Sequence, residues 1–420
     1  MAEKTAYSEA AQTGKYDRPT GLLGKYDNVR RFWEDRITAA FLAPALSGLV
    51  DTKRRDRAGL RILDLGCGSG DGLDLLTGVS DPDASLLAAD TSILSRSVLG
   101  QYVGLDINEE LIRQAEATYR GALKTRFVQG DLSNGLPSVT TSMVPFDLYF
   151  AGYGTLSHFT DEQCARIIGD ICAHARAGAV FVGDWLGRYS YEWQDLWHHP
   201  VSQQYFMDYR ITYIYPEQER HSVEVTSFPL RLMTRDEIMA VTAEAESRSR
   251  ARLTPLTFFD RSILVGRHMD TGDYNQNCVR LRHAVNTLLE QYRRTDLDSL
   301  MISYVPVDGF DELNSFFDRF FAAWNSLVRY TKALLEQFGQ PTPSADPGQG
   351  ASDSVPVPLK EAMEAIRQVV DVAGSLSWCE ARANLIEPTL AYCLRKLEME
   401  LQMGLGVGHG LIGVFRIEKQ

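Results

Sequence analysis

A short glycine-rich segment, LDLGCGSGDG at residues 63–72, constrains the fold of this chain more than any other feature. The apolar run before it is typical of a buried strand, and the residues after it favour a helix. Gly66, Gly68 and Gly70 lie between the two, where glycine permits positive φ angles and close approach of a ligand to the backbone. This order predicts the first unit of an open α/β sheet, which binds ligands at the carboxyl ends of its strands. Alternatively, the glycines form only a tight turn.

Four further apolar runs continue the pattern, at residues 102–107, 125–131, 146–152 and 179–185. Helical stretches such as 109–119 and 161–175 separate most of them. Strands that alternate with helices predict parallel pairing. We therefore expect an α/β fold with a Rossmann-like, mostly parallel seven-stranded sheet, helices on both faces and a helical C-terminal region. Residues 252–259 and 262–268 predict a hairpin that completes the sheet, and 410–419 predict a final strand.

The chain divides into three regions: an N-terminal helical cap (1–59), a Rossmann-like domain (60–270) with an aromatic-rich insertion (186–222), and a helical C-terminal domain (271–420) with a flexible loop (340–358). Helical spacing of Val29, Trp33 and Ile37 predicts the amphipathic helix of the cap. An aromatic stripe near the start of the long helical stretch indicates a core face, with a dimer interface or a lid as alternatives. Its members are Phe316, Phe317, Phe320, Phe321 and Trp324.

Composition excludes several classes of protein. The 420 residues carry a net charge of −12, which weighs against a nucleic-acid partner because phosphate backbones repel acidic surfaces. No apolar run is long enough to span a membrane, and the polar N-terminus lacks the features of a secretory signal, so we expect a cytoplasmic protein. The six cysteines form no CxxC pair and no cluster with histidine, which predicts reduced thiols and no metal site.

Acidic residues lie at or near the ends of three of the predicted strands. Asp64 precedes the glycines, where it disfavours a pyrophosphate and suits a cation or an amine. Asp106 ends the second strand, where a carboxylate can accept both hydroxyls of a ribose; it could instead cap the next helix. Asp131 ends the third strand and could receive the amino group of adenine, or serve as a turn residue.

Strand by strand, roughly residues 20–270 resemble the class I S-adenosylmethionine-dependent methyltransferases. The resemblance implies that S-adenosylmethionine is the cofactor, with its ribose on Asp106 and its adenine beside Asp131 and Leu132. The leading helix resembles the cap of small-molecule N-methyltransferases such as glycine N-methyltransferase, whose residues close over the methionine end. The remaining cofactor-binding residues implied here are Tyr26, Arg31, Trp33, Asp64, Gly66, Cys67, Gly68, Gly70, Ile107 and Ala151.

The segment GYGTLSHF, residues 152–159, resembles the part of these enzymes that runs under the transferred methyl group. His158 is the candidate base, with Tyr153 and Asp184 as further catalytic candidates; for all three, packing or capping is the alternative. The aromatic stretch 185–215 could form a substrate box, because aromatic faces attract cations, or simply a core. The substrate-binding candidates are Trp185, Arg188, Trp193, Trp197 and Tyr205.

These features together predict a methyltransferase that acts on nitrogen or oxygen of a small molecule. The segment after the fourth strand reads GYGT and lacks the [DNS]-P-P-[YFW] tetrapeptide of amino-group DNA methyltransferases. Two alternatives stay open. One is other chemistry of the same cofactor, either aminocarboxypropyl transfer or a cyclisation that releases methylthioadenosine, and the other is a non-catalytic scaffold that binds it. We expect a small-molecule substrate, no nucleic-acid or membrane partner, and a homodimer through the helical C-terminal region.

Overall fold

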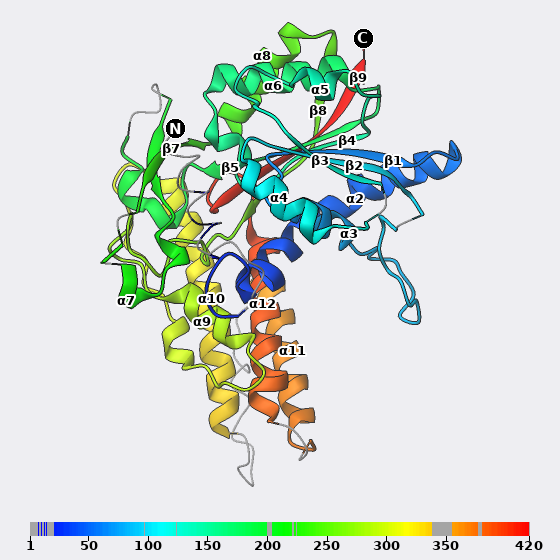
Figure 1. Cartoon of the computed structure of the whole chain (residues 1–420). Coiled ribbons are helices and arrows are strands. Elements are labelled where there is room, and N and C mark those ends of the chain that lie inside the picture. The colour runs from blue at the N-terminus through cyan, green and yellow to red at the C-terminus, as the bar shows by residue number, and fades with distance from the viewer. Residues whose placement is uncertain are drawn as a thin grey trace.

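The computed structural model of the chain has a sheet domain from which a group of helices projects (Figure 1). It describes residues 21–419, except 96, 123, 200–203, 221, 224, 338–354 and 377–379, together with residues 7, 10, 12 and 14. Most of the loop predicted at 340–358 lies outside the described residues. Among the described helices, none combines the length and the apolar character needed to cross a membrane.

Five parallel strands form the centre of the sheet in the order β3-β2-β1-β4-β5. Each falls where an apolar run predicted it, so this part of the sequence interpretation is confirmed. The parallel order brings the carboxyl ends of all five strands to one edge of the sheet. Their bounds are β1 Leu60–Leu65, β2 Leu99–Asp106, β3 Thr125–Gln129, β4 Leu148–Ala151 and β5 Val180–Gly187.

The last strand of the chain, β9 (Gly410–Lys419), pairs antiparallel with β5 on one side and with β8 (Ala251–Arg261) on the other. The seven strands β3-β2-β1-β4-β5-β9-β8 therefore form the predicted sheet. The expected hairpin of 252–259 with 262–268 is wrong, because β8 has β9 as its partner. The final strand predicted at 410–419 forms, and it belongs to the sheet instead of to a separate helical domain.

A short hairpin branches from the carboxyl end of β5. Its strand β7 (Ser227–Met233) pairs in parallel with β5 at Leu186 and Gly187, and β6 (Phe206–Arg210) pairs antiparallel with β7. The hairpin includes part of the aromatic-rich insertion. It brings side chains of the aromatic insertion to the carboxyl edge of the sheet.

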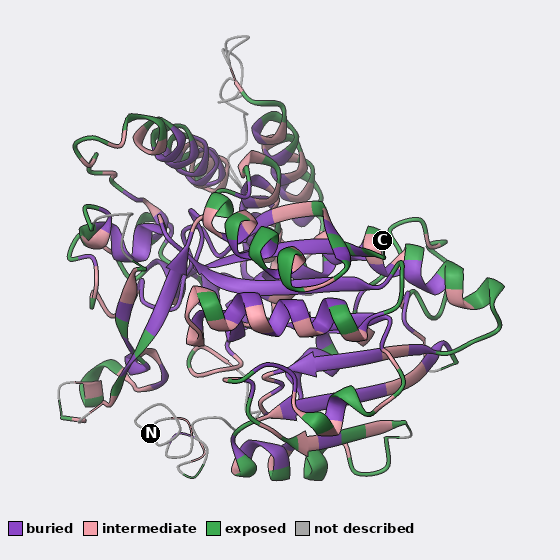
Figure 2. Cartoon of the chain, turned by 90° about the horizontal axis from the view of Figure 1, so that it is seen from above, coloured by how far each residue is buried: buried purple, intermediate pink, exposed green. Residues whose placement is uncertain are grey.

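Helices cover both faces of the sheet, which confirms the predicted fold class (Figures 1 and 2). One face packs against α6 and α8, which both begin with a capping box at a threonine, Thr160 and Thr234 respectively. The other face packs against α2, α3 and α4. The bounds of these and the short helices of the domain are η1 Arg30–Glu34, α2 Asp35–Arg55, α3 Asp71–Thr77, α4 Glu109–Thr118, α5 Ser138–Thr141, η2 Thr155–His158, α6 Asp161–His174, η3 Tyr191–Leu196, η4 Thr212–Ile214, α7 Glu217–Arg220 and α8 Arg235–Arg248.

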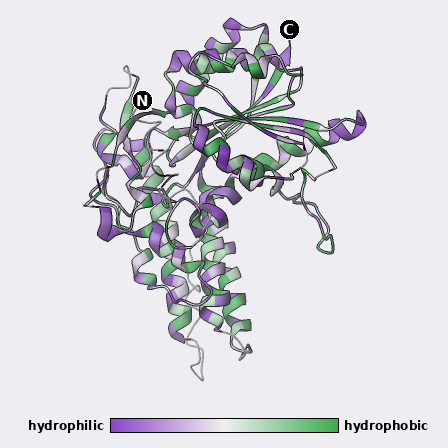
Figure 3. Cartoon of the chain, in the orientation of Figure 1, coloured by the Kyte–Doolittle hydropathy of each residue, from purple (hydrophilic) through white to green (hydrophobic). Residues whose placement is uncertain are grey.

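The C-terminal helices are an insertion between β8 and β9. In Figure 1, α10, α11 and α12 run side by side away from the sheet, and Figure 3 shows apolar residues recurring along them. The aromatic stripe of α10 is buried within the chain, which confirms its interpretation as a core face. The last helix, α12, begins at Glu387, and Pro388 lies in its first turn, where a missing N–H is tolerated. The bounds are α9 Leu281–Leu288, η5 Leu297–Leu300, α10 Asp311–Gln337, α11 Val357–Ala373, η6 Arg382–Ile386 and α12 Glu387–Leu401.

The leading helix joins the two parts of the molecule. Trp33 is buried, its ring lies 5.9 Å from that of Trp324, and its Nε1 donates to Glu398 Oε2 at 2.8 Å. Farther along, Phe41 stacks on Phe259 at the end of β8. The predicted amphipathic face is therefore correct, and Trp33 faces the inserted helices.

Candidate active site

The glycine turn after β1 lies at the carboxyl edge of the sheet, as predicted. All three glycines have positive φ angles. A β-carbon at Gly66 would lie 2.5 Å from Thr155 Cγ2, so this position requires glycine for packing. A β-carbon at Gly68 would meet no atom within 4 Å, because Gly68 borders open space. The turn thus presents bare backbone toward a cavity.

Asp106 lies directly beside the same turn. Its Oδ2 accepts a hydrogen bond from the Gly68 N–H at 2.8 Å, and its Oδ1 accepts one from the Asn108 N–H at 2.8 Å. The cap of α4 is Asn108, whose side chain accepts from Glu110 and Leu111, so the alternative role of Asp106 as helix cap is wrong. Burial raises the pKa of Asp106, while the two backbone N–H groups favour its charged form.

A cavity of about 410 Å³ opens between the glycine turn and the inserted segments. It is lined at one end by residues from the ends of β2 and β3, and at the other by arginines and tyrosines from distant parts of the chain. Nine predicted site residues line it: Gly66, Cys67, Gly68, Asp106, Ile107, Asp131, Leu132, Tyr153 and His158. The sequence pattern thus predicted most of the residues that line the cavity near the ends of β2 and β3.

Asp131 is a turn residue that also lines the cavity. Its Oδ1 accepts from the Ser133 N–H at 2.8 Å and from the Ser133 hydroxyl at 2.6 Å, which makes it a turn residue. The same residue lines the cavity beside the buried Leu132. The turn therefore holds the end of β3 while it leaves Asp131 at the cavity wall.

Asp64 and Gly70 support the turn from behind and do not line the cavity. Asp64 is buried and accepts a hydrogen bond from the Tyr102 hydroxyl; burial raises the pKa of Asp64 to about 8. A β-carbon at Gly70 would lie 2.5 Å from the ring of Tyr119. The prediction that Asp64 faces a bound amine is therefore corrected. Ala151 is likewise buried beneath the edge of the sheet.

The N-terminal cap contributes cations to the cavity, but not the ones predicted. Lys25 Nζ lies 2.8 Å from Asp71 Oδ2, and Arg30 Nη2 lies 3.7 Å from the same atom; all three residues line the cavity. The hydroxyl of Tyr26 donates a hydrogen bond to Asp71 Oδ1. Arg31 and Tyr26 line a second space of about 320 Å³ on the far side of Arg30. The predicted residues Tyr26, Arg31 and Trp33 therefore do not line this cavity.

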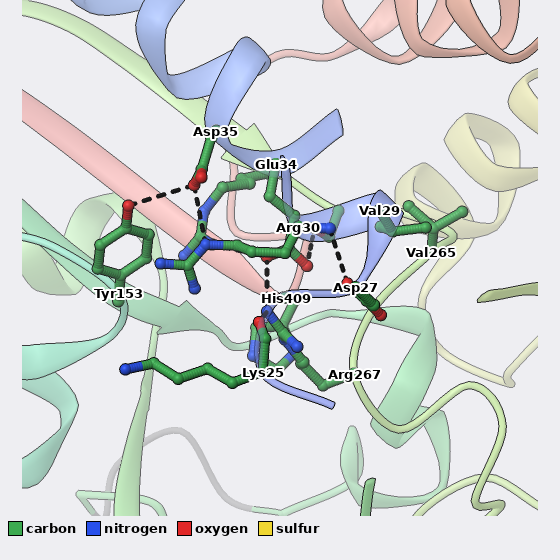
Figure 4. Close-up of polar contacts among 12 residues, drawn as sticks. Lys25, Asp27, Val29, Arg30, Glu34, Asp35, Tyr153, Val265, Arg267 and His409 are labelled. Carbon is green, nitrogen blue, oxygen red and sulfur yellow. Dashed lines mark hydrogen bonds and ion pairs between the residues drawn. The ribbon is translucent and has the colours of Figure 1, made fainter. Parts of the chain in front are cut away.

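Tyr153 is held in a strained conformation at the middle of the cavity. Its φ is 60°, which is uncommon for a residue other than glycine. The Arg30 guanidinium lies 3.5 Å from the centre of its ring, and its hydroxyl donates to Asp35 Oδ1 at 3.2 Å (Figure 4). Burial raises the pKa of Tyr153 well above its usual range, so it is a neutral phenol.

One carboxylate, Glu34, organises the arginines at the far end. Glu34 is buried, and its oxygens contact Arg282 Nη1 at 2.8 Å, Arg267 Nη2 at 3.2 Å and Arg261 Nη1 at 3.5 Å. Arg267 and Arg261 line the cavity with it. Asp184 contacts Arg261 Nη2 at 2.7 Å, but does not itself line the cavity. It is therefore corrected from a catalytic candidate to a partner of Arg261.

The five predicted substrate residues lie outside the cavity. Trp185 packs in the core beneath the sheet. The Nε1 of Trp193 donates to Gly187 O at 2.9 Å, and that of Trp197 to Ser190 O at 3.1 Å. Arg188 donates to a backbone carbonyl and lies over the ring of Tyr205. The aromatic segment thus forms a core, its alternative interpretation, although Tyr209 and Tyr213 from the same insertion do line the cavity.

No protein-family model matches the chain, and no curated protein does. Solved structures that match include S-adenosylmethionine-dependent methyltransferases from Clostridium acetobutylicum (16% identity, TM-score 0.32, 52% of this chain and 83% of the other) and Methanosarcina mazei (19%, 0.33, 49% and 85%). The SAM-bound CalS10, an amino pentose methyltransferase from Micromonospora echinaspora, is 16% identical with a TM-score of 0.32 over 62% of this chain and 93% of its own. At these identities the likeness concerns the fold alone.

Proposed function

We propose that this protein is an S-adenosylmethionine-dependent methyltransferase that methylates nitrogen or oxygen of a small molecule. The observation that carries the proposal is the placement of Asp106. Both of its oxygens are fixed by backbone N–H groups, and each oxygen retains a lone pair. An ionised carboxylate held in this way at the end of the second strand can accept two hydrogen bonds from a ribose diol.

The rest of this end of the cavity fits an adenine ring. Ile107 and Leu132 supply apolar contacts, and Asp131 and Gln163 supply polar atoms at the rim. A purine needs apolar surface on its faces and a few hydrogen-bonding groups at its edge. The residues after β2 and β3 therefore match the nucleoside part of the cofactor.

Lys25, Arg30 and Asp71 fit the methionine part. A carboxylate and an ammonium group lie together at the end of this moiety. The two cations can pair with the carboxylate, and Asp71 can pair with the ammonium group, because all three side chains line the cavity next to the open space at Gly68. The pKa of Asp71 is lowered to about 2, since Lys25 and Arg30 outweigh the effect of its burial, so its charge is present at neutral pH.

Tyr153, Tyr209, Tyr213 and the arginines define the remaining space, where the acceptor would bind. The bound cofactor supplies a methyl carbon activated by an adjacent sulfonium. This chain's task is then to hold the acceptor atom in line with that carbon and to exclude water, and positioning of this kind supplies much of the acceleration in transfer reactions. A cavity of about 410 Å³ that also holds the cofactor favours a small acceptor.

Replacement of Asp106 tests the proposed function. We expect Asp106→Ala to weaken binding of S-adenosylhomocysteine by about 1–3 kcal/mol, because charge-assisted hydrogen bonds to the ribose are lost. Isothermal titration calorimetry on the full chain measures this change. Asp236→Ala, which removes an exposed carboxylate on α8, is the matched control and should leave the affinity unchanged. An unchanged dissociation constant in the Asp106 variant would reject the ribose site.

Product analysis separates the proposed reaction from the other chemistry of the same cofactor. Methyl transfer produces S-adenosylhomocysteine, whereas aminocarboxypropyl transfer and cyclisation both produce methylthioadenosine. Mass spectrometry of reactions with candidate amines and phenols distinguishes the two products. Accumulation of methylthioadenosine would contradict methyl transfer, but it would still be consistent with the proposed cofactor site.

A further inference from the structure

His409 lines the cavity from the loop that leads into β9, far in sequence from the other site residues. Its backbone N–H donates to Ser262 O at 3.1 Å, and its carbonyl accepts from the Gly187 N–H at 3.2 Å. Those two partners follow β8 and end β5, respectively. The sheet therefore fixes the backbone of His409 from both sides.

The loop before His409 is held by one buried carboxylate. Asp260 Oδ2 accepts from the Leu405 N–H at 2.9 Å, and its Oδ1 accepts from the N–H groups of Gly406 and Gly408 at 2.9 and 3.1 Å. Burial raises the pKa of Asp260 to about 6, and the backbone N–H groups oppose that shift. Three hydrogen bonds to one side chain leave this loop little freedom to move the ring.

The ring of His409 is oriented by Glu192, which comes from η3 in the aromatic insertion. Its Nδ1 lies 2.6 Å from Glu192 Oε2, and the other oxygen of Glu192 accepts the His268 backbone N–H. Glu192 is fully buried in a close-fitting pocket, because a β-carbon at Gly266 would lie 2.0 Å from its carboxyl carbon. The carboxylate of Glu192 therefore contacts two nitrogen atoms, Nδ1 of His409 and the backbone N of His268.

The contact with Glu192 determines which nitrogen of His409 carries a proton. Burial alone would raise the pKa of Glu192, but the neighbouring His409 and the backbone N–H of His268 hold it below its usual value. Glu192 is therefore an ionised acceptor, so Nδ1 of His409 must be the donor. In the neutral imidazole, Nε2 is then the nitrogen with a lone pair, and no hydrogen bond to another described residue uses it.

We propose that His409 is the general base of the methyl transfer and that Glu192 is its positioning residue. This inference rests on the proposed function. As the lone pair of the acceptor nitrogen or oxygen forms a bond to the methyl carbon, the carbon–sulfur bond breaks and its electron pair stays on sulfur. The proton of the acceptor N–H or O–H moves to His409 Nε2. The resulting imidazolium is stabilised by the negative charge of Glu192.

Other groups packed around His409 are compatible with this role. The ring of Trp193 lies 5.5 Å away and that of Tyr209 lies 6.5 Å away, both centroid to centroid. The ionisable groups that lie near the ring on the surrounding elements are Glu192, Tyr209, His268 and Asp184. His158, the base expected from sequence, stacks on Phe228 and lines the same cavity. His409 lies among the residues of the acceptor end.

The first test reads the protonation of His409 directly. Long-range ¹H–¹⁵N correlation spectra of the full chain labelled with ¹⁵N-histidine should show His409 in the Nδ1–H form, with Nε2 unprotonated. Glu192→Gln should abolish this preference, because an amide can donate as well as accept. A protonated Nε2 in the neutral ring of the wild-type protein would overturn the proposal.

The second test asks whether Nε2 faces the position of the transferred methyl group. Sinefungin carries an amine-bearing carbon in place of the methylated sulfur, so its ammonium group should donate to His409 Nε2, whereas S-adenosylhomocysteine has no group there. We expect His409→Gln to weaken sinefungin binding by about tenfold and to leave S-adenosylhomocysteine within about twofold. His198→Gln, at an exposed histidine outside the cavity, is the matched control.

The outcomes separate the base from the cofactor site. Selective loss of sinefungin affinity supports His409, while equal loss of both ligands, no loss of either, or selective loss in His158→Gln instead would overturn its assignment. If the wild-type protein binds neither ligand, the proposed function is wrong, and the assignment of His409 as the base is wrong as well. Thermal unfolding of each variant confirms that the compared proteins are folded.

Discussion

Removal of residues 410–420 is expected to prevent the chain from folding, although these residues follow a long helical insertion. The strand β9 is the partner of both β5 and β8, and Leu411, Ile412, Val414, Phe415 and Ile417 on it are at most 1% exposed. Without β9, two edges of the sheet and both core faces beside them would be open. We expect insoluble protein or loss of a cooperative unfolding transition by circular dichroism.

Point variants of β9 make the same test without truncation. Phe415→Asp places a charge in the core and should destabilise the fold by at least about 3 kcal/mol, whereas Arg416→Gln changes the adjacent exposed side chain and should leave the unfolding midpoint in urea nearly unchanged. A truncated protein that melts like the full chain would show that β9 does not complete the sheet.

Glu34→Ala is expected to be the most destabilising single change among the cavity residues. The Glu34 carboxylate is 1% exposed and contacts Arg267, Arg282 and Arg261. Removal of one partner from a buried ion pair costs about 3–5 kcal/mol, because the opposite charges stay buried without compensation. Urea denaturation measures the change. Glu364→Ala, at an exposed ion pair on α11, is the control and should not shift the midpoint.

The pH dependence of stability is an independent test of the ion pairs between Glu34 and the three arginines. Burial alone would raise the pKa of Glu34, but the surrounding guanidinium groups hold it well below the usual range. Because the folded-state pKa is lower than the unfolded one, the stabilisation is present above the unfolded pKa and is lost as pH falls through the folded one. Glu34→Gln should therefore reduce the dependence of stability on pH in the acid range. Equal pH profiles for this variant and the wild type would contradict the network.

The parts of the fold that could be predicted are those fixed by local pattern. Apolar runs located β1 to β5, and Gly66, Gly68 and Asp106 located the edge at which the cavity opens. These signals are local because a buried parallel strand and a glycine turn each need particular residues at adjacent positions. The same kind of signal predicted a strand at 410–419, but not its partner. Pairing across an insertion depends on the packing of the whole domain, and the hairpin at 252–268 was predicted wrongly for that reason.

The acceptor end of the cavity had no local signal. Arg261, Arg267 and His409 come from three separate segments, and each matters only because Glu34 or Glu192 lies beside it in space. Aromatic residues were a misleading signal in the insertion, since Trp193 and Trp197 serve equally well as core residues. Trp33 was assigned to the cofactor by resemblance, and its buried partner Glu398 could not be inferred from spacing.

The crystal structure of the complex with S-adenosylhomocysteine tests the central claim most directly. The account predicts the ribose hydroxyls on Asp106, the adenine between Ile107 and Leu132, and the amino-acid end beside Lys25 and Asp71. Its sulfur should point toward Tyr153 and the acceptor space beyond it. Density for the ligand anywhere else, or no binding at concentrations that saturate the site of an active methyltransferase, would contradict the account.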